Sequence, residues 1–217
     1  MKQRQKSKIV NPNNISFIYF DLGGVVIIDF SGNNKWNELK EKLKIPSSKS
    51  ILFDKIFDEY EKQICTNMDI ESMKGILNKE LGINIPLTYS LLKEFVNRFE
   101  KNPSIWPIIK NIKKKYPIGL FTMMYPRMLN TIKESGIIPA IDWNITIDSS
   151  IVRYTKYDIE MFDIATKKAN VPKKEILLIE NSMKHIETAQ NYGWQTFFYN
   201  PNDIDKSNTN LITYIGL

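Results

Sequence analysis

Short apolar runs and amphipathic segments alternate along most of the chain. The runs are rich in β-branched and aromatic residues, which predicts buried strands; they cover residues 15–20, 117–122, 143–147, 176–179 and 195–199. Between them, apolar residues recur at helical spacing, over 105–115, 128–135, 158–170 and 182–192. Strands that alternate with helices are typical of a parallel sheet covered on both faces, so we predict an α/β, Rossmann-like, doubly wound fold.

One long segment interrupts this alternation after the first strand. Its apolar residues recur at helical spacing among many charges, with breaks at Pro46 and Pro86 and no strand pattern. We therefore predict an all-helical domain inserted into the α/β domain. The predicted organisation is a basic tail (1–14), an α/β core (15–30 and 104–200), a helical insertion (31–103) and a loose C-terminal end (201–217).

Composition narrows the class of protein. Of 217 residues, 42% are hydrophobic and 25% are charged, the ordinary balance of a soluble globular protein. No apolar run approaches the roughly 20 residues that a membrane helix needs, and residues 1–14 lack the apolar core of a secretion signal. Cys65 is the only cysteine, which excludes an internal disulfide. We expect a cytoplasmic protein that does not bind membranes.

The formal net charge of +6 does not point to a nucleic-acid partner. Four of the six excess charges come from lysine and arginine residues within 1–14, a segment without acids. Such a basic start is more often a solvated tail than a binding arm. We expect no nucleic-acid partner, and a monomer or homodimer that acts on a small molecule.

Polar side chains directly follow the predicted strands: Asp21, Thr122, Asp148 and Glu180–Asn181. The carboxyl ends of parallel strands meet at one edge of a sheet, where ligands bind. Lys156 could reach the same crevice from the segment after the third strand. Hard oxygen ligands, phosphate-binding donors and a carboxylate nucleophile together suit a magnesium-supported phosphoryl site.

Four of these segments, in order, resemble the motifs of the haloacid dehalogenase (HAD) superfamily. The run 20–25, Phe-Asp-Leu-Gly-Gly-Val, is similar to the first motif, Thr122 to the second, Lys156 to the third and Glu180–Asn181 to the fourth. A helical insertion after the first motif resembles the helical-cap branch of that family. The resemblance extends from residue 15 to 199.

The resemblance implies an enzyme, a hydrolase with Asp21 as nucleophile. Asp21 would attack phosphorus and form an aspartyl-phosphate, which water then hydrolyses. Thr122 and Lys156 would hold the phosphoryl oxygens. The substrate implied is a small phosphorylated metabolite.

The resemblance also implies further contacts around the nucleophile. Mg²⁺ would lie between the Asp21 carboxylate, the carbonyl oxygen of Gly23 and the Glu180–Asn181 pair. Backbone N–H groups at Gly23 and Gly24 could form an anion-binding nest. Met123 and Arg127, which follow the second motif, are expected to contact the substrate.

The first and fourth motifs depart from the family pattern. Most phosphatases of the family carry a second aspartate two residues after the nucleophile, as general acid and base, and here that position is Gly23. Loss of such a group typically costs about 10²–10⁴ in rate. The nearest downstream acid is Asp29. In the fourth motif, Glu180 and Asn181 replace the usual aspartate.

Simpler interpretations stay open for each residue. Asp21 and its glycines are also favoured in a tight turn, and Thr122 is an ordinary last residue of a strand. Asn181 is a good helix N-cap. The departures also allow a HAD-fold protein that binds a ligand or partner with weak or no catalysis. A dehalogenase, which would use Asp21 without a metal, is a further alternative.

Overall fold

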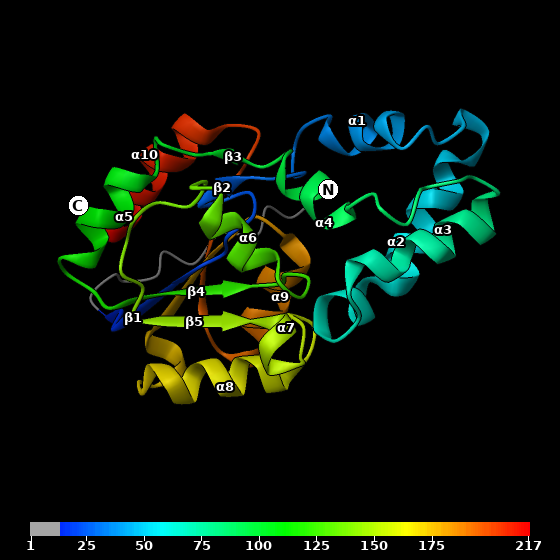
Figure 1. The fold of residues 1–217 in the computed structure, drawn as a ribbon. Coiled ribbons are helices and arrows are strands. Elements are labelled where there is room, and N and C mark those ends of the chain that lie inside the picture. Colours follow the sequence, from blue (N-terminus) through cyan, green and yellow to red (C-terminus); the bar gives the residue numbers. More distant parts are fainter. Residues whose placement is uncertain (1–13) are drawn as a thin grey trace, which may run out of the picture.

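The structure is a computed structural model that describes residues 14–217, so almost all of the predicted basic tail lies outside it. The core is a five-stranded, all-parallel sheet in the order β5-β4-β1-β6-β7 (Figure 1). The strands are β1 (Phe17–Phe20), β4 (Ile118–Thr122), β5 (Ile145–Asp148), β6 (Ile176–Glu180) and β7 (Gln195–Phe198). This confirms the predicted α/β, Rossmann-like fold.

Helices cover both faces of the sheet. Alternate residues of β1 enter different cores, because successive side chains of a strand point to opposite faces: Tyr19 belongs to one apolar cluster and Ile18 to the other. The cluster around Tyr19 includes residues of α8 (Ile159–Ala169) and α9 (Met183–Tyr192). The cluster around Ile18 includes residues of α5 (Trp106–Lys113), α6 (Met128–Glu134) and α10 (Ile204–Ile215). A short helix, α7 (Ser149–Val152), follows β5.

The helical insertion lies beyond the end of the sheet toward which the arrowheads of β4 and β5 point (Figure 1). Its helices are α1 (Lys35–Lys42), α2 (Ser50–Thr66), α3 (Met73–Leu81) and α4 (Leu91–Val96). Aromatic rings pack among them, with Trp36 in edge contact with Phe57 and Phe95. At its base, β2 (Ile27–Ile28) pairs antiparallel with β3 (Glu100–Lys101), a two-residue strand too short to leave a sequence pattern.

The C-terminal segment is ordered, which corrects the expectation of a loose end. The side chain of Asp203 accepts a hydrogen bond from the backbone of Lys206 and begins α10. Leu211 and Ile215 are buried against the sheet, one turn apart. Preceding them on the buried side are polar residues, including Asn208, which accepts a hydrogen bond from the Tyr199 hydroxyl at 2.9 Å. Because these polar residues lie on the buried side, the sequence of α10 has no continuous apolar stripe.

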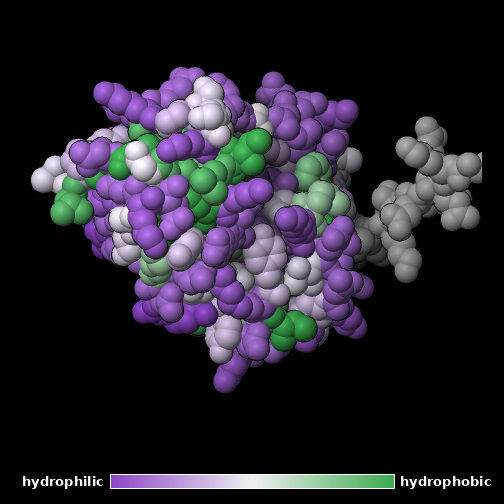
Figure 2. Space-filling model, turned by 90° about the vertical axis from the view of Figure 1, so that its right-hand side faces the viewer, coloured by the Kyte–Doolittle hydropathy of each residue, from purple (hydrophilic) through white to green (hydrophobic). Residues whose placement is uncertain are grey.

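The surface seen from the side of the helical insertion is mostly hydrophilic, with one group of apolar side chains gathered in its upper part and a few separate ones elsewhere (Figure 2). Among the insertion's apolar residues, Ile51 and Leu87 are the most exposed, at 71% and 84%. Within residues 14–217, no helix combines the length and the apolar character required to cross a bilayer.

Candidate active site

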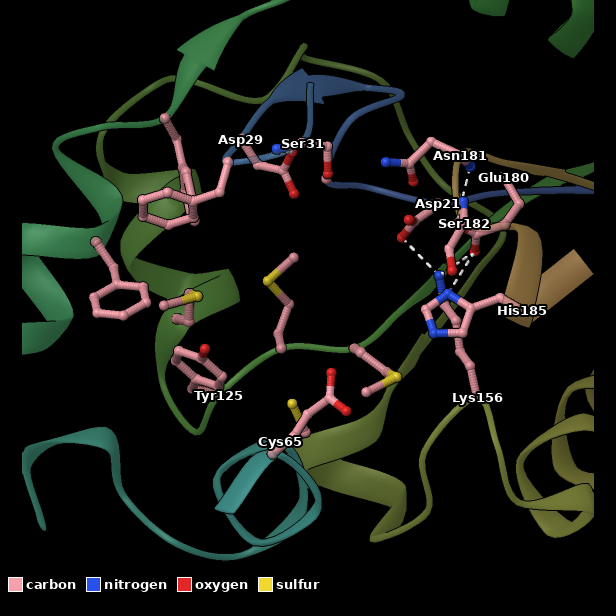
Figure 3. A pocket seen from close by; sticks show the side chains of 18 residues that line it. Asp21, Asp29, Ser31, Cys65, Tyr125, Lys156, Glu180, Asn181, Ser182 and His185 are labelled. Carbon is pink, nitrogen blue, oxygen red and sulfur yellow. Dashed lines mark hydrogen bonds and ion pairs between the residues drawn. The ribbon is translucent and has the colours of Figure 1, made fainter. Parts of the chain in front are cut away.

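A cavity of about 280 Å³ lies where the sheet meets the helical insertion (Figure 3). Its polar wall comes from the segments after β1 and β6 and from Lys156. Its apolar wall includes Met123, Met124 and, from α4, Phe95, while α2 contributes Glu61 and Cys65. The C-terminal edge of a parallel sheet is thus closed by inserted helices, as expected for a ligand site.

Asp21 lies directly after β1, and Lys156 holds its side chain. One carboxylate oxygen, Oδ1, accepts a hydrogen bond from the backbone of Leu22 and contacts Lys156 Nζ, each at 2.7 Å. The same ammonium group donates to Oε2 of Glu180 at 2.7 Å. Lys156 and Glu180 are almost completely buried, at 1% and 0% exposure, and Asp21 is 8% exposed. One buried cation therefore links two acidic motifs from neighbouring strands.

The charges in this group set the pKa values of its members. Burial alone would raise the pKa of Glu180, but the charge of Lys156 and the ring of His185 outweigh it and hold that pKa well below its ordinary value. Burial and the negative charge of Glu180 raise the pKa of Asp21, which Lys156 only partly offsets. Burial would lower the pKa of Lys156, yet its two acidic partners raise it. Asp21 is thus the member of this group whose ionised form a further positive charge would stabilise most.

Glu180 is the most firmly held acid of the site. Its Oε1 accepts hydrogen bonds from the backbone N–H groups of Asn181 and Ser182, both at 2.9 Å. Nδ1 of His185, in the first turn of α9, lies 3.4 Å from Oε2. His185 lines the cavity beside Glu180. One carboxylate therefore contacts both Lys156 and the backbone just before α9.

The side-chain amide of Asn181 lies inside a cluster of oxygens. One of its terminal atoms is 3.2 Å from the Gly23 carbonyl oxygen, 3.1 Å from Asp21 Oδ2 and 3.0 Å from Glu180 Oε1. With the amide nitrogen at this position, Asn181 donates to these oxygens and accepts a hydrogen bond from the Ser31 hydroxyl. Gly24 permits this approach, because it has a φ of +72° and an added Cβ would come within 2.2 Å of the amide.

The donor set of this cluster fits a hard divalent cation. If the Asn181 amide is turned over, its oxygen joins a carbonyl oxygen and two carboxylate oxygens at 3.0–3.2 Å from it. Octahedral Mg²⁺ binds oxygens at about 2.0–2.1 Å, which places neighbouring ligands about 3 Å apart. An Asn181 oxygen at these distances is repelled by the other three oxygens unless a cation lies among them.

The other expected contacts divide into two groups. Thr122, at the end of β4, is fully buried and is not among the residues that line the cavity, and its hydroxyl has no hydrogen-bond partner among residues 14–217. Met123 lines the cavity. Arg127 lies outside the cavity lining and forms a two-pronged ion pair with Asp69 of the insertion, at 2.7 and 2.9 Å. The structure does not bring Arg127 to Asp21.

Asp29 and Ser31 are among the lining residues that were not identified from the sequence as site residues. Asp29 and Ser31 lie at one edge of the cavity, and Asp29 directs its carboxylate into it (Figure 3). Oδ1 of Asp29 accepts a hydrogen bond from the Ser31 backbone at 2.8 Å. Burial raises the pKa of Asp29, and the hydrogen bonds from Ser31 oppose that shift. The available sequence signal was the missing side chain at Gly23 together with an acid after the second apolar run.

Solved structures with the same fold include several hydrolases. A HAD family enzyme from Bacteroides thetaiotaomicron is 17% identical and covers 85% of this chain and 93% of its own, at a TM-score of 0.68. Its wild-type form has also been crystallised with magnesium and inorganic phosphate, with a TM-score of 0.66 to this chain. An L-2-haloacid dehalogenase is 16% identical, with a TM-score of 0.61 over 85% of this chain and 83% of that one.

A predicted HAD-like family hydrolase from Porphyromonas gingivalis covers 92% of this chain and 98% of its own, with 17% identity and a TM-score of 0.67. No protein-family model and no curated protein matches the sequence. The chain therefore has the fold of the HAD hydrolases, along nearly the whole of its described length.

Proposed function

We propose that this protein is a Mg²⁺-dependent phosphatase that hydrolyses a small phosphorylated metabolite through an aspartyl-phosphate on Asp21. The observation that carries the proposal is the position of the Asp21 carboxylate: one oxygen contacts Lys156 and the other lies in the oxygen cluster. The magnesium and phosphate complex of the structural neighbour supports the same chemistry.

Mg²⁺ would be held by oxygens of Asp21, Gly23, Glu180 and Asn181, and it would supply the positive charge that lets a carboxylate approach a phosphate dianion. Asn181 accommodates both conditions of the site. Without a cation, its amide nitrogen donates to the cluster, and with a cation its oxygen can turn inward. Rotation of the Asn181 amide would thus replace its hydrogen bonds to the oxygen cluster with a contact between its oxygen and the cation.

The phosphoryl group would be held by this chain's own donors. Lys156 is a fixed positive charge 2.7 Å from the nucleophile, so it can contact a phosphoryl oxygen as the attack proceeds. The buried hydroxyl of Thr122 lacks a partner among the described residues, and a phosphoryl oxygen would satisfy it. The cavity of about 280 Å³ suits a small substrate with an apolar part against Met123 and Phe95.

A dehalogenase is the second candidate, favoured by the fold of the L-2-haloacid dehalogenase and by the apolar wall of the cavity. It would use Asp21 to displace a halide from carbon and would need no cation. A ligand-binding protein without turnover is the third. It would keep the Asn181 amide nitrogen permanently in the oxygen cluster and would not bind Mg²⁺.

The deciding experiment measures phosphate release from a panel of phosphorylated metabolites and an aryl phosphate, with Mg²⁺ and with EDTA. We expect release that requires Mg²⁺ and disappears in Asp21→Asn. Halide release from 2-haloacids that persists in EDTA would instead establish the dehalogenase. No turnover and no Mg²⁺ binding in the folded wild type would establish the binding protein.

A further inference from the structure

The carboxylate of Asp29 occupies the space that a side chain at position 23 would fill. A Cβ added to Gly23 would lie 2.3 Å from Oδ2 of Asp29 and 3.0 Å from its Cγ. Real atoms cannot approach so closely, so the glycine and the aspartate exclude any larger residue at position 23. An acid is therefore present at the place where the first motif lacks one, but it comes from six positions further along the chain.

The local fold brings Asp29 back to Gly23, two residues after the nucleophile. After Asp21 the chain turns tightly, with the N–H groups of Val26 and Ile27 both donating to the Leu22 carbonyl at 3.0 Å. Strand β2 then leads directly into Asp29, so this residue returns beside Gly23. The Ser31 backbone N–H fixes Oδ1 of the carboxylate at 2.8 Å, and Oδ2 is the oxygen that faces Gly23.

On the basis of the proposed function, we propose that Asp29 is the general acid and base of the reaction. In the first step an Asp21 oxygen forms a bond to phosphorus while the bond to the leaving oxygen breaks. The leaving oxygen keeps the electron pair and takes the proton of the Asp29 carboxylic acid. In the second step the Asp29 carboxylate takes a proton from water as the water oxygen attacks phosphorus. The bond to Asp21 breaks, phosphate leaves, and Asp29 is again protonated.

Several other titratable side chains line the cavity. Burial raises the pKa of Cys65 and of Tyr125, and Glu61 and His185 are placed differently from Asp29. His185 lies 3.4 Å from Glu180, in the group around Lys156. Glu61 belongs to α2 of the helical insertion. Neither is shown to occupy the space that a side chain at position 23 would fill, whereas the Asp29 carboxylate does occupy it.

The first test compares leaving groups in the isosteric variant Asp29→Asn. An alkyl phosphate needs protonation of its leaving oxygen, so its kcat should fall about 10²-fold or more. A nitrophenyl phosphate needs little protonation, so its first step should persist and the second step should become slow. The variant should release a burst of about one nitrophenol per enzyme before a slow steady state. Equal losses on both substrates without a burst would indicate a structural role and overturn the proposal.

The second test moves the carboxylate from position 29 to position 23. Asp29→Ala removes the group that blocks position 23. The double variant Asp29→Ala, Gly23→Asp should therefore be at least tenfold more active than Asp29→Ala alone. Gly23→Asp alone is the matched control, and it should be impaired because its Cβ meets Asp29. No recovery in the double variant, with the same fold by circular dichroism, would contradict the role of Asp29.

The two proposals fail in different ways. If the wild type hydrolyses phosphate esters and Asp29→Asn keeps its rate on alkyl phosphates, only the role of Asp29 is refuted. If the folded wild type releases no phosphate from any ester with Mg²⁺, the proposed function is refuted, and the role of Asp29 is refuted with it.

Discussion

Lys156→Met should destabilise the protein strongly, because it leaves two buried carboxylates without their shared cation. Both Asp21 and Glu180 have an oxygen 2.7 Å from Nζ, so these oxygens are separated by no more than twice that distance. Removal of one partner from a buried ion pair costs about 3–5 kcal/mol. With both acids bound to one lysine, we expect a loss of about 4 kcal/mol in the free energy of unfolding at pH 7.

The loss of unfolding free energy in Lys156→Met should become smaller as the pH falls. In the wild type the pKa of Glu180 is held below its unfolded value, so its contribution is present at neutral pH and is lost in acid, as the pH falls through the folded-state pKa. In the variant, burial raises the pKa of both carboxyls without the opposing charge of Lys156. Protonation of the folded state then relieves the repulsion, and the difference between the two proteins should decrease from pH 7 toward about pH 5.

Urea unfolding at several pH values measures this effect, and the chain offers a matched control. Lys62 forms an ion pair of the same length, 2.7 Å to Asp158, but its side chain is 65% exposed. Lys62→Met should therefore change the unfolding midpoint only slightly. Equal losses in the two variants, or a loss in Lys156→Met that does not depend on pH, would refute the electrostatic account of the site.

Three further predictions concern other parts of the structure. Gly24→Ala should weaken Mg²⁺ binding at least tenfold in calorimetry, because the added Cβ would lie 2.2 Å from the side-chain amide of Asn181. Gly136 also has a positive φ but has open space around it, so Gly136→Ala should leave the Mg²⁺ affinity unchanged. Leu211→Ala should cost about 2–5 kcal/mol in urea unfolding because the side chain is buried in α10, and the 37% exposed Ile212 should tolerate alanine with a much smaller loss. Burial raises the pKa of the Cys65 thiol, so a thiol reagent at pH 7 should react slowly with native protein and rapidly in urea; fast native labelling would contradict the burial.

The sheet and the order of its motifs could be predicted from the sequence because the relevant signals are local. Runs such as Ile176–Ile179 are apolar over their whole length, which suits a strand buried on both faces. Parallel strands then bring their carboxyl ends together, so Asp21 and Glu180 had to lie near each other. The position of Lys156 in the chain allowed it to reach this crevice, but its role followed only from the family resemblance, since an isolated lysine carries no signal of burial.

The other features of the site and the fold depend on contacts between distant parts of the chain, which no local sequence pattern indicates. Asp29 reaches Gly23 only because the turn before β2 reverses the chain, and a one-residue change in that turn would direct it elsewhere. Arg127 was expected to contact the substrate, but its guanidinium pairs with Asp69, 58 positions away. In α10 the polar residues on the buried side, such as Asn208, interrupt the apolar stripe, and their hydrogen-bond partners are visible only in the fold.

The most direct test of the central claim is the uptake of BeF₃⁻, a phosphoryl analogue, in the presence of Mg²⁺. Fluorine NMR or calorimetry would follow binding to the wild type and to Asp21→Asn, with EDTA as the metal-free control. The account predicts one BeF₃⁻ per chain in the wild type, and none in Asp21→Asn or in EDTA. No uptake by the folded wild type with Mg²⁺, or equal uptake by Asp21→Asn, would contradict the assignment of Asp21 as the nucleophile of a magnesium-dependent phosphatase.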